Sequence, residues 1–291
     1  MATSAANVVK QTIFDQERAP ARLVSVAESD GIEDLLLYQF RYVGVSRPAG
    51  ISNYHLIFVN VGPSVAAHCK IRHAELNHVV MPGSITVIPS DTEWSAVIGE
   101  GAEMAVAAIP RARLAVAAAG IMNDIPPIEP RLTGRDAELV SLIKEMTLGA
   151  MLQTADEAAW HSLADELVGH LLANYGRPGQ RLGRGTLAPP VVATINRFLE
   201  AHLEERISID ELADVAGQTP SHFPRLFRRT IGMSPHQYVM RLRLRRAKIL
   251  IAQGYALAEA ADEAGFTDQS HLTSWFRRIY GTTPGRLSPG R

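Results

Sequence analysis

The chain has 291 residues, of which 46% are hydrophobic and 20% are charged, and its formal net charge at pH 7 is −1. This is the composition of an ordinary globular protein, and the length suffices for two domains with their own cores. The single cysteine, Cys69, excludes an internal disulfide, and neither a signal peptide nor an apolar run of about 18 residues is found, so we expect a cytoplasmic protein without a membrane partner.

The N-terminal half begins with a polar, patternless stretch, and we expect residues 1–20 to form a flexible arm. From residue 35 to residue 110, short apolar runs then alternate with turns rich in Gly and Pro. Many short strands at this spacing predict an antiparallel barrel of the jelly-roll kind.

The pattern becomes helical after residue 110. Residues 111–119 are a short Ala-rich candidate, and residues 135–151 and 157–174 carry apolar side chains at heptad-like steps. Stripes of this kind pack against the protein's own core or form a seam between two chains. The stripe in the first of the two long helices is retained as a candidate dimer interface, formed by Leu139, Ile143 and Met146.

A boundary follows these helices. Residues 176–190 are rich in Gly and Pro and show no apolar period, which is typical of a linker. We therefore expect an α+β protein of two domains: a β-barrel with flanking helices over residues 21–175, a linker over 176–188, and an all-α domain over 189–291.

The last third of the chain contains one short sequence twice. Residues 221–235 read SHFPRLFRRTIGMSP, and residues 270–284 read SHLTSWFRRIYGTTP, at an offset of 49. Upstream, ELADVA at 211–216 returns as EAADEA at 259–264, at an offset of 48. Each copy predicts a short helix, a tight joint with glycine and a second helix, so we expect two helix-turn-helix units.

Charge is unevenly distributed along the chain. From residue 186 onward, 14 Lys and Arg oppose 10 Asp and Glu, and no acidic residue lies between Asp214 and Glu259. This acid-free segment contains eight basic residues, Arg225, Arg228, Arg229, Arg241, Arg243, Arg245, Arg246 and Lys248. A basic run is usually a solvated face, but one that spans a helix-turn-helix favours nucleic acid.

The second helix of each copy has an apolar face and a polar face, and we expect the polar face to enter the major groove of double-stranded DNA. Arg225 suits a bidentate pair with guanine, although a phosphate contact or an internal salt bridge is the alternative, and Gln269 suits adenine. The candidate base contacts are Ser221, His222, Arg225, Gln269, Ser270, Thr273 and Ser274. The candidate phosphate contacts are Arg228, Arg229, Arg277 and Arg278.

A long helix is predicted between the two units. Residues 235–253 would make it about 28 Å long at 1.5 Å per residue. Major-groove faces recur every ~34 Å on one side of B-DNA, so both units can reach adjacent turns of one duplex face.

These motifs resemble those of the AraC/XylS family of bacterial transcription regulators. The residues that carry the resemblance read AGQTPSHFPRLF at 216–227, GMSPHQY at 232–238 and AGFTDQSHL at 264–272. The resemblance implies a seven-helix DNA-binding domain with two helix-turn-helix units, a small-molecule effector, RNA polymerase as a partner and a homodimer. The N-terminal pattern is similar to the cupin-like sensor barrels of this family.

The chain departs from the family pattern at two positions. Pro224 stands where a groove-facing residue usually bonds a base, and Ser274 replaces a longer polar or basic side chain. A proline at the fifth position of a helix beginning at Pro220 would crowd the Pro220 carbonyl and lose a hydrogen bond. We therefore predict a late or kinked start, near Ser221 or His222, with Pro224 in the first turn.

An enzymatic barrel is the remaining alternative. Cupin metal sites need His-x-His and a following Glu, whereas His68, His73 and His78 are spaced by five, which sends neighbours to opposite faces of a regular strand. We therefore expect no metal, no cofactor and no catalytic residue. The prediction is a DNA-binding activator controlled by a small molecule in its barrel, and the alternative is a barrel that binds a protein partner.

Overall fold

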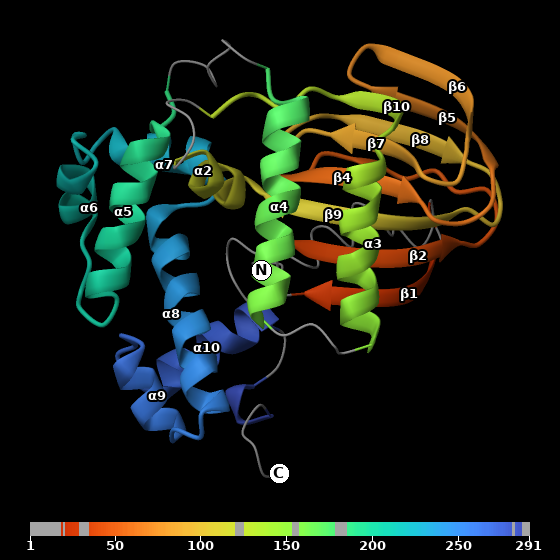
Figure 1. Ribbon diagram of the computed structural model, residues 1–291. Coiled ribbons are helices and arrows are strands. Elements are labelled where there is room, and N and C mark those ends of the chain that lie inside the picture. The colour runs from red at the N-terminus through yellow and green to blue at the C-terminus, as the bar shows by residue number, and fades with distance from the viewer. Residues whose placement is uncertain are drawn as a thin grey trace.

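The computed structural model describes residues 19, 21–28, 35–119, 125–152, 157–177, 185–280 and 283–286. The N-terminal region is rich in β-strands and the C-terminal region is helical, as predicted (Figure 1). The predicted arm lies outside the described residues except for Ala19, and so do residues 178–184 of the predicted linker. No helix within the described ranges has the length and apolar character that a membrane span requires.

The described strands form two antiparallel sheets. The first has the order β1-β2-β9-β4-β7-β10, with the bounds Ala21–Glu28, Leu36–Tyr42, Glu103–Pro110, Tyr54–Asn60, Ser84–Ile88 and Arg131–Arg135. The second has the order β3-β8-β5-β6, with the bounds Ala49–Gly50, Trp94–Ile98, Val65–Ile71 and Ala74–Val80. The predicted apolar runs thus become β2 and β4 to β9.

The central strands β4 and β9 of the six-stranded sheet are buried on both faces. Alternate residues of β2, such as Tyr38 and Phe40, face the four-stranded sheet and join a core with Trp94 of β8. The other face packs on helices, and both sides of β4 are therefore apolar, with all seven of its residues buried. The strand consequently reads as a continuous apolar run, which is typical of a strand covered on both sides.

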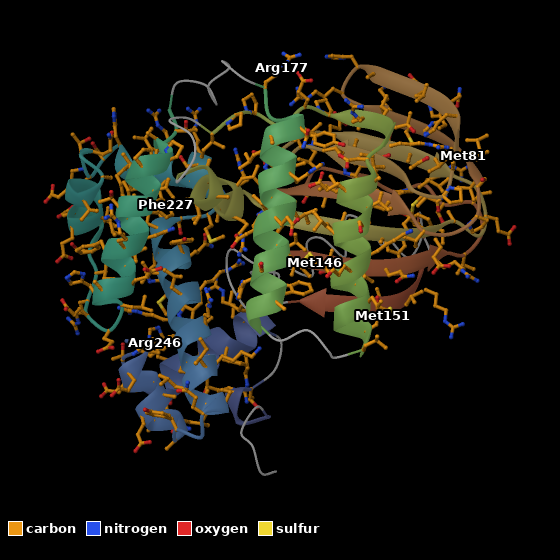
Figure 2. All side chains as sticks on the ribbon, viewed as in Figure 1. Met81, Met146, Met151, Arg177, Phe227 and Arg246 are labelled. Carbon is orange, nitrogen blue, oxygen red and sulfur yellow. The ribbon has the colours of Figure 1, made fainter. Side chains whose placement is uncertain are left out.

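Two helices, α3 (Ala137–Leu152) and α4 (Glu157–Tyr175), cover the outer face of this sheet, and α2 (Arg111–Ala119) follows β9 and lies between α4 and α5 (Figure 1). The side chains of Leu139, Ile143 and Met146 are each 0% exposed within a single chain. Met146 lies where α3 faces the sheet (Figure 2). The predicted dimer interface on these three residues is therefore wrong, because α3 uses this stripe to pack on its own sheet.

The C-terminal region consists of short helices around one longer helix. They are α5 (Pro189–His202), α6 (Ile209–Val215), α7 (Phe223–Ile231), α8 (Pro235–Ala252), α9 (Leu257–Glu263), α10 (Gln269–Tyr280) and a 3-10 turn at Pro284–Arg286. Capping explains two of the starts. Ser208 and Glu211 bond reciprocally before α6, and Ser234 and Gln237 do so before α8, where Pro235 is the first helical residue.

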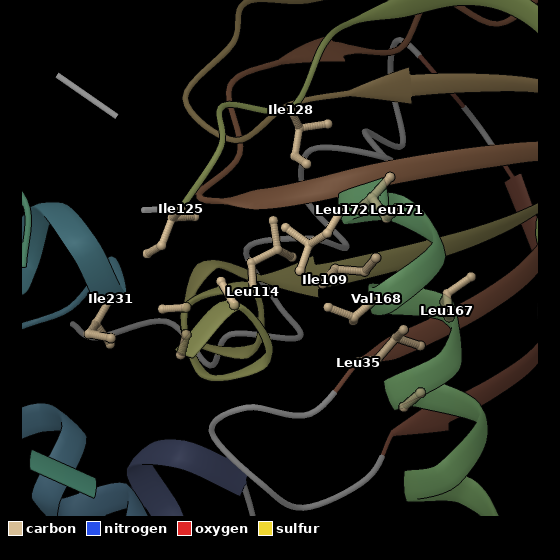
Figure 3. Packing of buried hydrophobic residues seen from close by; sticks show 14 of the residues in the cluster. Leu35, Ile109, Leu114, Ile125, Ile128, Leu167, Val168, Leu171, Leu172 and Ile231 are labelled. Carbon is tan, nitrogen blue, oxygen red and sulfur yellow. The ribbon is translucent and has the colours of Figure 1, made fainter. Parts of the chain in front are cut away.

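The core of the N-terminal region continues into the first part of the helical region. Leu114 of α2 and Ile231 of α7 belong to the same buried cluster as Ile109 and Val168 (Figure 3). Val192 and Ile195 of α5 join it as well. The helices α5 and α7 are therefore packed against the β-rich region through α2. The helices α9 and α10 have a separate core with the C-terminal half of α8.

Candidate nucleic-acid interface

The two copies of the repeat fold into the same local structure. In the first, Gly217 has a φ of 60°, and the N–H of Gln218 donates to the carbonyl of Ala213 at 2.8 Å. In the second, Gly265 has a φ of 79°, and the N–H of Phe266 donates to the carbonyl of Ala261 at 2.8 Å. The 48-residue offset thus holds for individual hydrogen bonds, and glycine supplies the left-handed conformation in both joints.

The helix α7 begins late, as Pro224 predicts. Its first residue is Phe223, and His222 occupies the cap without a side-chain cap bond. Pro224 is the second residue, where an N–H has no partner inside the helix, so the proline costs no hydrogen bond. Ser221 lies beside the cap, with its Oγ 3.3 Å from the Oγ1 of Thr219.

The exposed face of α7 brings together the predicted contact residues. Phe223, Phe227 and Ile231 are buried, and Phe227 lies among the helices of the C-terminal region (Figure 2). The exposed side chains are Ser221, His222, Arg225, Arg228 and Arg229. Arg229 lies against Gly185, since a Cβ at that glycine would stand 2.5 Å from its Nη1.

The helix α10 presents an equivalent face. Asp268 caps its start by accepting the N–H of His271 at 2.8 Å, and Leu272 and Phe276 are buried beneath it. Gln269, Ser270, Ser274, Arg277 and Arg278 are exposed, and Thr273 is half-buried. The guanidinium of Arg278 lies over the ring of Trp275, 5.0 Å from its centroid, which is a cation–π contact.

One helix, α8, connects the two exposed faces. With 18 residues, α8 is about 27 Å long. Tyr238 and Val239 in its first half belong to the larger core, and Leu244 and Ile251 in its second half belong to the core around α10. The two exposed faces are therefore connected by continuous helix.

Two residues of the acid-free basic segment have structural partners. Arg243 donates from Nε to the carbonyl of Leu203 at 3.0 Å and from Nη2 to that of Glu205 at 2.5 Å, and burial lowers its pKa. Arg246 donates to Glu204 at 3.3 Å. Both hold α8 to the segment after α5, so they are poorly placed for phosphates.

The sequence alone did not reveal this role, because the partner groups of Arg243 and Arg246 lie some 40 residues away. The requirement for Gly265 is equally non-local. A Cβ at this position would overlap the Leu203 carbonyl and the guanidinium of Arg243.

A helix-turn-helix domain model matches residues 212–288. The probable transcriptional regulator LumQ of Photobacterium leiognathi is 44% identical over 93 residues, which are 32% of this chain and 38% of LumQ. The transcriptional activator RhaS of Escherichia coli O1:K1 / APEC is 30% identical over 95 residues, 32% of this chain and 34% of RhaS. A crystal structure of a transcriptional regulator with an AraC-type DNA-binding domain from Chromobacterium violaceum is 29% identical and covers 35% of this chain and 96% of its own, with a TM-score of 0.32.

The C-terminal region of the chain is an AraC-type helix-turn-helix domain. The resemblance inferred from the repeated motifs is confirmed, and DNA binding is the activity of such a domain. The chain spans less than two fifths of the length of LumQ and RhaS, so this likeness concerns the AraC-type domain alone. The matched residues include all of α7, α8, α9 and α10.

Among the three histidines considered for a metal site, His68 has partners of another kind. The ring of His68 contacts the side chains of Asn77 at 2.5 Å and Glu75 at 2.7 Å on the surface of β5 and β6. Within the described part of the chain, no three His, Cys, Asp or Glu side chains gather where they could hold a metal ion.

Proposed function

We propose that the chain is a sequence-specific transcription activator that binds double-stranded DNA with two helix-turn-helix units, α6–α7 and α9–α10. The observation that carries this proposal is the pair of equivalent exposed faces on α7 and α10, joined by α8. In this proposal Ser221, His222, Arg225, Gln269, Ser270, Thr273 and Ser274 contact bases, and Arg228, Arg229, Arg277 and Arg278 contact phosphates.

The geometry gives Arg225 a central role in the first unit. Because α7 begins at Phe223, Arg225 is in its first turn, where a side chain can reach base edges. Gln269 is the first residue of α10 and is placed similarly. A guanidinium pairs with guanine and an amide with adenine, so each unit has one residue suited to bidentate recognition.

A cupin-like barrel over residues 21–175, joined by a linker at 176–188 to the domain at 189–291, is the second part of the proposal. The strand orders β2-β9-β4-β7 and β3-β8-β5-β6 of the two facing sheets support it, because eight strands in two sheets are the architecture of a jelly roll. We assign to this barrel the binding of the small-molecule effector.

One cavity inside the proposed barrel is small. The cavity between the sheets, beside Cys69, Trp94 and Met104, has a volume of about 40 Å³, room for about two or three water molecules. Burial raises the pKa of the Cys69 thiol to about 11, so this thiol stays protonated and unreactive at neutral pH.

Activation of transcription requires a contact with RNA polymerase. A protein with this function works in the cytoplasm, where the DNA is. The activator role is supported by the likeness of the AraC-type domain to that of RhaS, which is named an activator. A homodimer would double the DNA contacts. The exposed apolar side chains Leu148, Met151 and Leu152 at the end of α3 are available for this interface.

The proposal is tested by selecting bound sequences from random DNA with the full chain and placing them upstream of a promoter. We expect two short recognition sequences one helical turn apart, and transcription that rises when the protein is present. The Arg225→Ala/Gln269→Ala variant is the control and should lose the preference at one base pair in each of the two recognition sequences. Recovery of unrelated sequences by the unaltered chain would contradict sequence-specific binding, and a fall in transcription would contradict activation.

A further inference from the structure

A larger cavity lies where the barrel meets the AraC-type domain. Its volume is about 200 Å³, compared with about 40 Å³ between the sheets. It is lined by segments that are distant in sequence: His55 of β4, the turn after β7, the beginning of α2, residues 125–128 and Thr230 of α7. The cavity therefore touches both parts of the molecule.

The polar wall of this cavity is basic. Arg111 pairs with Asp91 at 2.5 Å, and Arg72 donates to the Oγ1 of Thr92 at 3.3 Å. One carboxylate and two guanidinium groups thus line the cavity, and each guanidinium has five N–H donors, so donors remain for a ligand. Burial, and secondarily the charge of Arg111, lowers the pKa of His55 to about 3, which keeps its ring neutral.

Backbone conformation is unusual at the same place. Among the described residues other than glycine, a positive φ occurs at Arg72 and at Asp91, both 55°, and both residues line this cavity. The left-handed region is sterically unfavourable for an L-residue. Such conformations are concentrated at functional sites, where the surrounding structure maintains them.

The opposite wall is apolar. Leu114 of α2 and Ile125 and Ile128 of the following segment are nearly fully buried, and Pro126 and Pro127 lie between them. Apolar walls with a few converging polar groups are typical of small-molecule sites. The chemistry therefore suits a ligand with one negative charge and a compact apolar body.

We propose that this junction cavity binds a small monocarboxylate, whose carboxylate pairs with Arg72 and Arg111 and whose body contacts Leu114 and Ile125. This inference rests on the proposed function, because it assigns the effector of the regulator to a specific site. The cavity lies at the end of the barrel that is packed on the AraC-type domain.

The position of the cavity explains how the binding of such a ligand can affect the DNA-binding surface. Thr230, in the last turn of α7, donates to the Leu226 carbonyl at 2.9 Å and accepts the N–H of Leu187 at 2.8 Å. Arg111 also lies against Gly232, directly after α7. A ligand that displaces Asp91 from Arg111 acts on the end of the recognition helix, and DNA must in turn change the ligand's affinity by the same factor.

The first experiment titrates the full chain with propionate, cyclohexanecarboxylate and phenylacetate in a calorimeter. Phenylacetamide is the neutral control, because it matches phenylacetate in size and lacks the charge. We expect saturable binding of at least one carboxylate at one site per chain, and binding of the amide about tenfold weaker than that of phenylacetate. Saturation by none of the three carboxylates, or equal affinity for phenylacetate and its amide, overturns the proposal.

Variants then locate the site. Arg72→Gln should weaken carboxylate binding about tenfold or more, and Arg72→Lys, which keeps the charge, should retain part of the affinity. Arg47→Gln removes an exposed charge elsewhere on the barrel, and Ala67→Leu fills the interior cavity, and both should bind as the unaltered chain does. Unchanged binding by Arg72→Gln, or loss of binding in Ala67→Leu, overturns the assignment.

DNA selection with the same samples separates this inference from the proposed function. A chain that selects a DNA sequence but binds no carboxylate contradicts the junction site alone. A chain that binds phenylacetate through Arg72 but selects no DNA sequence contradicts the regulator function and leaves the site standing.

Discussion

His55 is an ionisable side chain buried in the neutral form. It is 8% exposed, and its Nδ1 accepts the N–H of Ser90 at 3.2 Å. Burial lowers its pKa to about 3 in the folded protein, against 6.5 for an ordinary histidine. Between these two values the unfolded chain binds more protons than the folded chain, so the free energy of unfolding rises with pH across this interval.

We expect His55 to reduce the free energy of unfolding by about 2 kcal/mol when the pH falls from 7 to 5. Urea unfolding at both pH values measures this difference, and the His55→Gln variant should lose it. His73→Gln, in the exposed turn between β5 and β6, is the matched control and should behave as the unaltered chain does. A His55→Gln variant with the same pH dependence as this control would show that His55 is not the responsible group.

Arg225 and Gln269 are the residues to which base recognition is assigned. Replacing either with Ala should cost about 1–3 kcal/mol of binding free energy and relax the preference at one base pair. Arg228→Ala and Arg277→Ala should instead weaken binding to all sequences alike, because phosphates carry no sequence information. Selection from random DNA distinguishes the two classes, and an unaltered preference in Arg225→Ala would exclude it as a base contact.

One residue, Pro224, determines where α7 begins. Pro224 occupies the first turn and cannot donate a hydrogen bond to Pro220, so the preceding turn, closed by the N–H of Phe223 and the carbonyl of Thr219 at 2.9 Å, stays outside the regular helix. The Pro224→Gln variant should extend α7 towards Pro220 and place an amide where it can bond adenine. A crystal structure of this variant would show the added turn, and DNA selection should show a new preference for adenine. A helix that still begins at Phe223 would mean that Pro224 does not determine the start.

The end of α3 is where we expect two chains to associate. Leu148, Met151 and Leu152 are 57%, 51% and 61% exposed, which is unusual for apolar side chains on adjacent turns. Leu148→Glu/Met151→Glu should convert a dimer of the full chain to a monomer, as light scattering would show. Glu145→Lys, on the same helix, alters an exposed side chain and should leave the dimer intact. A monomeric unaltered chain at micromolar concentration contradicts the dimer.

Elements with a strong local signal could be predicted from the sequence. The strands β2 and β4 to β9, the Ala-rich α2, the repeat and the late start of α7 all follow from apolar spacing, glycine or proline. The strand β10, RLTGR, has no apolar alternation. Backbone pairing with β7 holds it at the edge of the sheet, and this pairing leaves no pattern in its side chains. It could not be recognised from its residues.

The residues that a side chain contacts are harder to predict than the helix or strand to which it belongs. The spacing of Leu139, Ile143 and Met146 is the same whether the stripe packs on a sheet or on a second chain, so only the structure decides between them. The junction cavity could not have been predicted either, because Arg72, Asp91, Arg111 and Thr230 meet only after both regions have folded.

The exposed basic side chains of the AraC-type domain should together make the affinity for DNA depend on salt. If about six phosphates are neutralised, the slope of log affinity against log salt should be near −5. Arg228→Ala should reduce the magnitude of this slope by about one. Arg246→Ala should leave it unchanged, since Arg246 is already paired with Glu204. Fluorescence anisotropy over a range of salt measures these slopes, and a slope near zero would contradict phosphate contacts.

The continuous α8 also has a consequence for the evolution of operators. Since one continuous helix joins the exposed faces of α7 and α10, we expect that their separation cannot adjust to the DNA as it would across a flexible tether. An insertion of about five base pairs between the two recognition sequences turns the second one to the opposite side of the duplex, beyond the reach of α10. Mutations on α7 and α10 can therefore give related regulators new recognition sequences one base at a time, whereas a new spacing requires a change in the length of α8.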